Sequence, residues 1–175
     1  HLDIRKYGSG NAGTTNVLRT LGWKAGVITF LGDSFKCIIA VVLVHLIFGK
    51  THADIIQVLA MYTGMGVVLG HNYPFYMNFR GGKGIAVSFG VLLGLYPYMK
   101  PVLLLACCFL LFSFVIVITP NYHKTFATYL FATILVLFFG KNSYVSLGMI
   151  LISALVLGKL MLCREEREEI KVKLL

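Results

Sequence analysis

A polar segment near the start of the sequence has residue types that suit the binding of an anion. Residues 8–16 contain glycines, which permit unusual backbone angles and leave N–H groups uncovered. A helix that begins near Thr14 would direct its N-terminal N–H groups toward the same place, and Arg19 follows. The alternative is a flexible polar loop that leads into a membrane helix. The candidate anion-binding residues are Gly8, Ser9, Gly10, Asn11, Gly13, Thr14, Thr15, Asn16 and Arg19.

A second glycine-rich segment, residues 70–84, ends in Gly81, Gly82, Lys83 and Gly84 immediately before an apolar run. Backbone N–H groups and an ammonium group at the start of a helix suit a phosphate group. The segment is not a nucleotide-binding P-loop, because glycine follows the lysine where that motif requires Ser or Thr. The alternative is that the basic residues of this segment serve only as topology anchors.

Few other residues suggest chemistry. His71 adjoins the second segment, where it could be a hydrogen-bonded structural residue or a base. Asp33 and Lys36 lie three residues apart within an apolar run, so we expect an ion pair or a structural hydrogen-bond hub on one helical face. The His, Cys, Asp and Glu residues show no metal-ligand spacing, and we expect neither a metal nor another cofactor.

The composition indicates a membrane protein. Apolar residues make up 58% of the 175 residues and charged residues 13%, and the mean hydropathy is +0.82. These values exclude an ordinary soluble domain and a disordered chain. The formal net charge is +9, but the basic residues lie between apolar runs, which favours basic membrane loops over a nucleic-acid partner.

The apolar runs indicate the elements that must position the two segments. They occupy residues 25–48, 54–70, 85–98, 101–119, 125–140 and 145–163, which predicts an all-α membrane helix bundle with about six spans in a single domain, residues 1–175. The 85–98 run is short and could instead be a re-entrant or buried half-helix. With six crossings, most Lys and Arg residues share the side of both glycine segments, which is then the cytoplasmic side.

Long stretches of the sequence are similar to one known family. DIRKYGSGNAGTTNVLRTLG (residues 3–22), GHNYPF (70–75) and GGKG (81–84) resemble the acyl-phosphate-dependent glycerol-3-phosphate acyltransferases, which are bacterial integral membrane proteins. DSFK (33–36) also resembles a D-x-x-K motif of that family. Family members have seven spans, so the resemblance implies that one helix would precede His1.

The resemblance implies transfer of a fatty acyl group from acyl phosphate to the 1-hydroxyl of glycerol 3-phosphate, a step of phospholipid synthesis. It implies a multi-pass protein of the cell membrane whose partners are these two substrates and the lipid bilayer. An acyl phosphate is already activated, so this chemistry needs no enzyme nucleophile. The residues that would take part in catalysis are Ser9, Arg19, His71 and Lys83. The residues that would bind substrate are Gly8, Gly10, Asn11, Thr15, Asn16, Gly81, Gly82 and Gly84.

The C-terminal residues depart from the family. A third family motif, H-R-x-N-I-x-R-L, aligns with residues 166–173, where Glu166 replaces the histidine and Glu169 the asparagine. The alternative interpretation of residues 164–173 is a solvated helix of mixed charge. A rival function also stays open at this point, namely a non-catalytic paralogue or a membrane anion carrier that binds phosphate compounds. A carrier would more often show inverted repeats and helices broken at mid-membrane.

Overall fold

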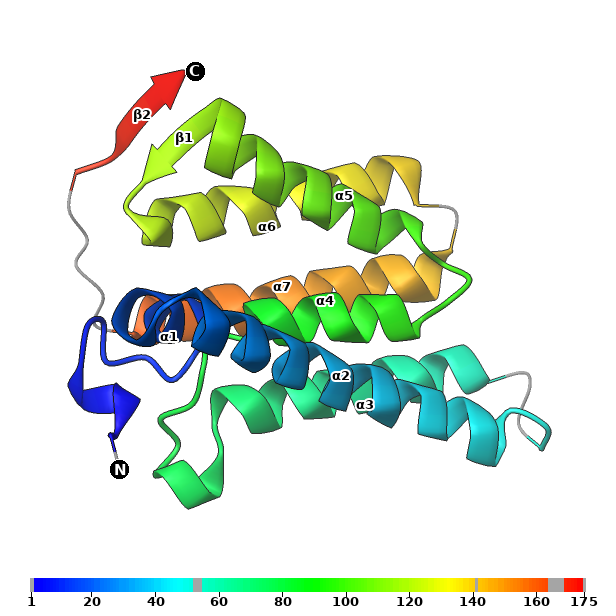
Figure 1. Ribbon diagram of the computed structural model, residues 1–175. Helices are drawn as coiled ribbons and strands as arrows, with labels where there is room; N and C mark the ends of the chain where they lie inside the picture. The colour runs from blue at the N-terminus through cyan, green and yellow to red at the C-terminus, as the bar shows by residue number, and fades with distance from the viewer. Residues whose placement is uncertain (1, 52–54, 141, 164–168, 175) are drawn as a thin grey trace. The chain divides into compact units, whose positions relative to one another are not determined.

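The computed structural model describes residues 2–51, 55–140, 142–163 and 169–174. The chain forms two compact units, His1–Tyr96 and Pro97–Leu175, which are termed unit 1 and unit 2 and are described separately (Figure 1). Both glycine segments belong to unit 1. The expectation of a single domain over residues 1–175 stays a prediction.

Unit 1 is built around one long helix, α2, from which α3 returns in the opposite direction (Figure 1). Short helical turns, marked η, and loops join the helices and carry the glycine segments. The elements are η1 (Ile4–Lys6), α1 (Thr14–Leu21), α2 (Trp23–Phe48), α3 (Ile56–Asn72), η2 (Phe75–Met77) and α4 (Ile85–Gly94).

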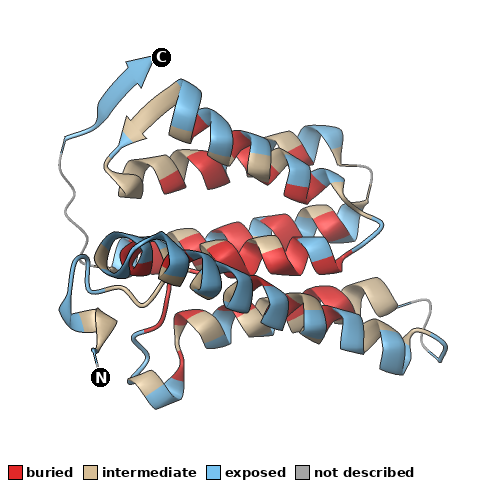
Figure 2. Ribbon diagram, viewed as in Figure 1, coloured by how far each residue is buried: buried red, intermediate tan, exposed pale blue. Residues whose placement is uncertain are grey.

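Helix α4 packs against both α2 and α3, and glycines allow the close approach. A Cβ atom added at Gly90 would collide with the carbonyl oxygen of Ser34 in α2, and one added at Gly64 of α3 would collide with Val91 of α4. The Ser34 hydroxyl also donates a hydrogen bond of 3.2 Å to the carbonyl oxygen of Ala86. Most residues of α4 are therefore buried (Figure 2).

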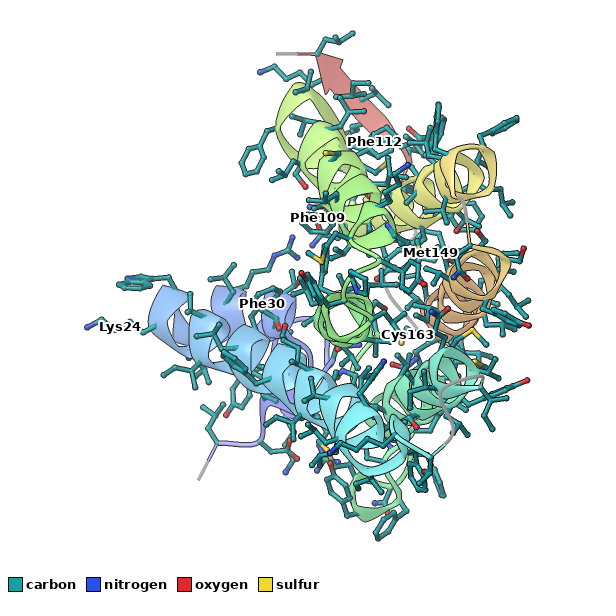
Figure 3. The ribbon with its side chains drawn as sticks, turned by 90° about the vertical axis from the view of Figure 1, so that its right-hand side faces the viewer. Lys24, Phe30, Phe109, Phe112, Met149 and Cys163 are labelled. Carbon is teal, nitrogen blue, oxygen red and sulfur yellow. The ribbon has the colours of Figure 1, made fainter. Side chains whose placement is uncertain are left out.

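Unit 2 consists of a helical hairpin and a further helix, with a small two-stranded sheet. Its elements are α5 (Lys100–Leu110), a π-helical turn η3 (Leu111–Val115), β1 (Ile116–Thr119), α6 (Asn121–Phe139), α7 (Ser143–Leu162) and β2 (Lys171–Leu174). The Thr133 and Ser153 hydroxyl oxygens lie 2.7 Å apart and join α6 to α7. Phe112, labelled in Figure 3, packs edge to face on Phe131 of α6 with ring centroids 5.4 Å apart.

Three of the described helices, α2, α6 and α7, are long and apolar enough to cross a membrane. Helix α2 turns large apolar side chains outward, and Ile28 and Leu46 are each 71% exposed. Such an apolar surface suits contact with lipid rather than water. The helical fold is thus confirmed, whereas the number of spans stays a prediction. With ten residues, α4 rises about 15 Å, half of the hydrocarbon core, which fits the half-helix alternative for residues 85–98.

The prediction that residues 101–119 form one span is wrong in its last part. The helix changes to a π-helical turn at Leu111 and ends at Val115, and Ile116–Thr119 form strand β1. Residues 115–119 are all β-branched, which restricts their χ1 angles in a helix and favours a strand. Hydropathy alone does not distinguish these two conformations.

The interpretation of the C-terminal residues as a helix is also wrong where the structure describes them. Lys171–Leu174 form β2, which pairs antiparallel with β1. Lys and aliphatic residues alternate in this stretch, which is the period of a strand rather than of a helix. Glu169 is exposed and precedes the strand, and Glu166 lies outside the described residues.

The crossing of α2 and α4 can be tested with Gly90→Ala. The added methyl group would collide with a backbone carbonyl, which cannot move as a flexible side chain can, so we expect a loss of about 1–3 kcal/mol in the free energy of unfolding. Gly66→Ala in α3 is the matched control, because nothing lies within 4 Å of a Cβ atom there. Thermal unfolding in detergent should show a lower Tm for Gly90→Ala only. Equal Tm values for both variants would contradict the close crossing.

Candidate functional site

Asn16 organises the first glycine segment. Its side chain is 3% exposed, and its Nδ2 lies 3.2, 3.0 and 2.9 Å from the carbonyl oxygens of Ile4, Tyr7 and Asn11. Its Oδ1 accepts a hydrogen bond of 3.0 Å from the backbone N–H of Ser9. A loop has no ladder of backbone hydrogen bonds, so one buried amide that contacts several backbone groups replaces it. Asn16 therefore holds the loop closed.

The loop also needs glycine at a defined point. Gly8 adopts φ +57°, which L side chains rarely adopt, and a Cβ atom there would collide with Oδ1 of Asn16. The chain then reaches Gly13, which is the N-cap of α1. Thr14 begins this helix, and its Oγ1 is buried with no hydrogen-bond partner among the described residues. The start of α1 thus offers N–H groups and a hydroxyl to a ligand.

The second glycine segment runs over His71, which lies at the end of α3. A Cβ atom at Gly81 would collide with the carbonyl oxygen of His71, and one at Gly82 would collide with Nε2 of its ring. Gly84 has φ +85° and is the N-cap of α4. No Cβ atom fits at Gly81 or Gly82, because their backbone packs directly on the His71 carbonyl group and ring, and the positive φ of Gly84 also favours glycine.

Three ionisable side chains meet between α2 and α3. Nζ of Lys36 lies 2.6 Å from Oδ1 of Asp33 and 2.9 Å from Nδ1 of His71. The predicted Asp33–Lys36 ion pair is confirmed by this geometry. His71 was not expected to join it, because the sequence separates His71 from Lys36 by a whole helical hairpin.

The tautomer of His71 follows from its neighbours. Nδ1 is 2.9 Å from the Lys36 ammonium, which can only donate, and 3.4 Å from Oδ1 of Asp33, which can only accept. The shorter contact assigns Nδ1 as the acceptor, so in the neutral ring Nε2 carries the proton. That N–H is the ring atom that packs at Gly82.

The two glycine segments are neighbours in unit 1. A Cβ atom at Gly13 would lie 3.9 Å from Cα of Gly82, so the N-terminal ends of α1 and α4 approach the same place. Arg5 links the segments again, since its Nη1 donates a hydrogen bond of 3.2 Å to the carbonyl oxygen of Met77. Two helix N-termini at one place create a positive potential that favours anions.

The positive charge of Arg5 is balanced by the carboxylate of Asp3. Asp3 accepts hydrogen bonds from the Arg5 side chain, with 2.9 Å between Nε and Oδ1, and from the Arg5 backbone N–H. These bonds hold the pKa of Asp3 below its usual value and raise the pKa of Arg5. The pair is charged at neutral pH with no net charge. Arg5 thus serves to join the segments rather than to add positive charge.

Two further predicted residues belong to α1 and to the second glycine segment. Arg19 is exposed in the last turn of α1, and Lys83 is half-buried between the glycines of the second segment. The structure brings both predicted segments together. It adds two residues that were not predicted as site residues, namely Asp33 and Lys36. The D-x-x-K spacing was the one sequence signal for both.

Comparison with known proteins gives one consistent family. The family model described as glycerol-3-phosphate acyltransferase matches residues 1–172. A glycerol-3-phosphate acyltransferase of Thermoanaerobacter sp. (strain X514) is 48% identical over 99 residues, 57% of this chain and 46% of that protein. One of Clostridioides difficile (strain 630) is 45% identical over 119 residues, 67% of this chain and 55% of that protein. The chain thus spans about half the length of the curated relatives it matches.

Solved structures agree with this result. The crystal structure of PlsY (YgiH), an integral membrane glycerol 3-phosphate acyltransferase, in its glycerol 3-phosphate form matches with a TM-score of 0.71 and 32% identity. The match covers 96% of this chain and 83% of that one. The lysophosphatidic acid form of PlsY matches with a TM-score of 0.70 and 32% identity, over 93% and 82% of the two chains. The membrane helix bundle and the family resemblance are thereby confirmed.

The role of Asn16 in the first segment can be tested with Asn16→Asp. The change keeps the shape of the side chain but replaces the donor Nδ2 by an oxygen that faces three carbonyl oxygens. We expect a loss of about 1–3 kcal/mol in stability, since the buried group becomes unsatisfied. Residues 3–13 should also become more sensitive to proteolysis.

The matched control is Asn78→Asp, which makes the same chemical change at an exposed position. Tm and the rate of cleavage by thermolysin are the measurements. If Asn16→Asp behaves like Asn78→Asp in both, the amide does not hold the loop.

Proposed function

The chain belongs to the glycerol-3-phosphate acyltransferase family, and we propose that it transfers a fatty acyl group from acyl phosphate to the 1-hydroxyl of glycerol 3-phosphate. The observation that carries this proposal is the meeting of two glycine segments at the N-terminal ends of α1 and α4. Both substrates carry a phosphate group, so the reaction needs one place that binds two anions. The glycerol 3-phosphate and lysophosphatidic acid forms of the similar PlsY structures support this substrate class.

The reaction balances without a covalent enzyme intermediate. The 1-hydroxyl oxygen attacks the acyl carbonyl carbon, an ester bond forms, and the bond from that carbon to the phosphate oxygen breaks. Phosphate leaves with the bonding electrons and takes up the hydroxyl proton, because the departing phosphate trianion is a strong base. The products are lysophosphatidate and inorganic phosphate. The protein must therefore align two substrates and stabilise negative charge as it develops.

The residues of unit 1 suit these tasks. The N–H groups at the starts of α1 and α4 would bind phosphate oxygens, together with Ser9, Thr15 and the glycines of both segments. Arg19 and Lys83 would add charge, Arg19 as a planar fork and Lys83 as a compact ammonium. Asn11 is already engaged in the loop, where its Oδ1 accepts from the N–H of Gly13 at 2.7 Å. It would act by shaping the start of α1.

His71 would act as a hydrogen-bond donor rather than as a base. Its Nδ1 is occupied by Lys36, and its Nε2–H packs at Gly82. A ring in this state has no free lone pair with which to accept the hydroxyl proton. The Lys36 ammonium would at the same time contribute positive potential beneath the second segment. This division leaves proton acceptance to the departing phosphate.

We propose further that both segments face the cytoplasm, in the cell membrane. The basic residues of the sequence support this orientation, since Lys and Arg accumulate in cytoplasmic loops. The acyl chain of the donor would lie among apolar helices while its phosphate reaches the two segments. The alternative of an anion carrier or inactive paralogue is not favoured, because the similar proteins are named as acyltransferases.

The anion site can be tested with Arg19→Ala and Lys83→Ala in the full-length protein. If each residue stabilises transition-state charge, each variant should lose about 2–4 kcal/mol, which is roughly 30- to 1000-fold in kcat/KM for glycerol 3-phosphate. Lys83→Arg should recover little activity, because a guanidinium does not fit between closely packed glycines.

Lys24→Ala is the matched control. Lys24 lies in the first turn of α2, close to the first glycine segment in sequence, but its side chain points outward from the helix (Figure 3). Its Nζ lies 5.9 Å from the centroid of the Trp23 ring. Removal of this charge should leave kcat/KM close to the wild-type value. Wild-type kcat/KM in both Arg19→Ala and Lys83→Ala would reduce these residues to topology anchors.

A further inference from the structure

The strands β1 and β2 form a ribbon with two different faces. Paired residues of antiparallel strands direct their side chains to the same side, and neighbours along a strand alternate. In the observed register Ile116 pairs with Leu174, and Ile118 pairs with Val172. One face is therefore entirely aliphatic, and it is termed the aliphatic face.

The opposite face is polar and cationic. Val117 pairs with Lys173, and Thr119 pairs with Lys171. The Thr119 hydroxyl also lies 3.4 Å from the carbonyl oxygen of Lys171. Both lysines of β2 thus project from the side away from the aliphatic face. Of the eight paired residues, the four on one face are all aliphatic. The other face carries two lysines, Thr119 and Val117.

The aliphatic face is exposed along β2 and half-buried along β1. Val172 is 59% exposed and Leu174 75% exposed, and Ile170, which precedes the strand, is 59% exposed, whereas Ile116 and Ile118 are half-buried (Figure 2). A two-stranded ribbon is marginal in water unless its apolar side is covered. The ribbon has only two strands among the described residues, so its aliphatic face needs an apolar surface from elsewhere.

The connections of β1 place the ribbon at the end of the helices. Strand β1 follows η3 directly, and only Pro120 separates it from α6. The helical part of this run, Lys100–Val115, has 16 residues and rises about 24 Å, which is less than the hydrocarbon core of about 30 Å. If this helix starts at one boundary of the hydrocarbon core, its far end and the start of the ribbon lie within roughly one helical turn of the other boundary.

The backbone excludes a position inside the hydrocarbon. Each outer edge of a two-stranded ribbon carries N–H and C=O groups without a strand partner, and such groups do not occur in contact with lipid tails. They need water or headgroups. The depth that satisfies both the outer edges and the aliphatic face is the interface, where an amphipathic element lies flat.

We propose that the β1–β2 ribbon lies in the leaflet at this end of unit 2, with its aliphatic face on the acyl chains of anionic lipids. Lys171 and Lys173, on the other face, reach the headgroup phosphates, as long cationic side chains do at membrane interfaces. Charge complementarity thus selects an anionic bilayer as the occupant. Strand β2 thus serves as a membrane-surface anchor.

The test uses full-length protein in vesicles of phosphatidylcholine and phosphatidylglycerol whose acyl chains carry bromine. All native tryptophans, including Trp23, are replaced by Phe, and one tryptophan is introduced by Val172→Trp or by Lys173→Trp. These neighbours differ in face and share the same strand. We expect strong quenching and a blue-shifted emission for Val172→Trp, and weak quenching for Lys173→Trp.

Two further variants keep the test decisive. Ile118→Trp places the probe on the aliphatic face of β1, so it should follow Val172→Trp even if the latter disturbs β2. Lys171→Gln combined with Lys173→Gln should remove the dependence of quenching on phosphatidylglycerol content. Equal quenching on both faces, or none on the aliphatic face, overturns the proposal. Loss of quenching together with protection from aqueous iodide also overturns it, since a second protein surface would then cover the face.

Discussion

The contact between Lys36 and His71 determines how the functional end of unit 1 is assembled. A lysine within an apolar helix is costly unless its charge is paired, and here both Asp33 and the His71 ring contact its ammonium group. This requirement fixes the position of α2 relative to α3 at the end where α3 terminates. The ring that satisfies Lys36 is also the surface on which Gly82 packs. One charge inside α2 therefore sets the course of the second glycine segment.

Side chains also fix the backbone of the first glycine segment. Neither segment has a ladder of backbone hydrogen bonds, so buried side chains must fix the backbone at a membrane boundary. Asn16 does this with one amide, and the Asp3–Arg5 pair attaches the start of the chain to the carbonyl of Met77. The starts of α1 and α4 are left uncapped by side chains in the structure. The N–H groups at these starts thus remain available at the place where we propose that two phosphate groups bind.

The sequence predicted the parts of this arrangement that depend on local composition. The glycine segments, the apolar runs and the Asp33–Lys36 pair follow from residue types and short spacings. The contact of His71 with Lys36 does not, because it depends on the packing of α3 on α2. Asn16 was predicted to bind substrate, but the structure commits its amide to the loop backbone. A direct contact with substrate stays a prediction that no observation tests.

The errors in the C-terminal part have one physical origin. Hydropathy and family alignment both treat residues 115–119 and 164–173 as helical or motif segments, yet the β-branched run and the alternation in Lys171–Leu174 favour strands. Each strand is short, and its stability depends on pairing with the other across the sequence. An average of hydropathy over one short stretch of sequence does not detect the pairing of that stretch with a distant one.

The most direct test of acyl transfer is a product measurement with the full-length protein in vesicles. The protein is given acyl phosphate and labelled glycerol 3-phosphate, and both lysophosphatidate and inorganic phosphate are quantified. The account predicts one phosphate released for each labelled lysophosphatidate formed. Phosphate release without labelled product would identify a hydrolase, and the absence of both products would identify a binding protein. Either result would contradict the account.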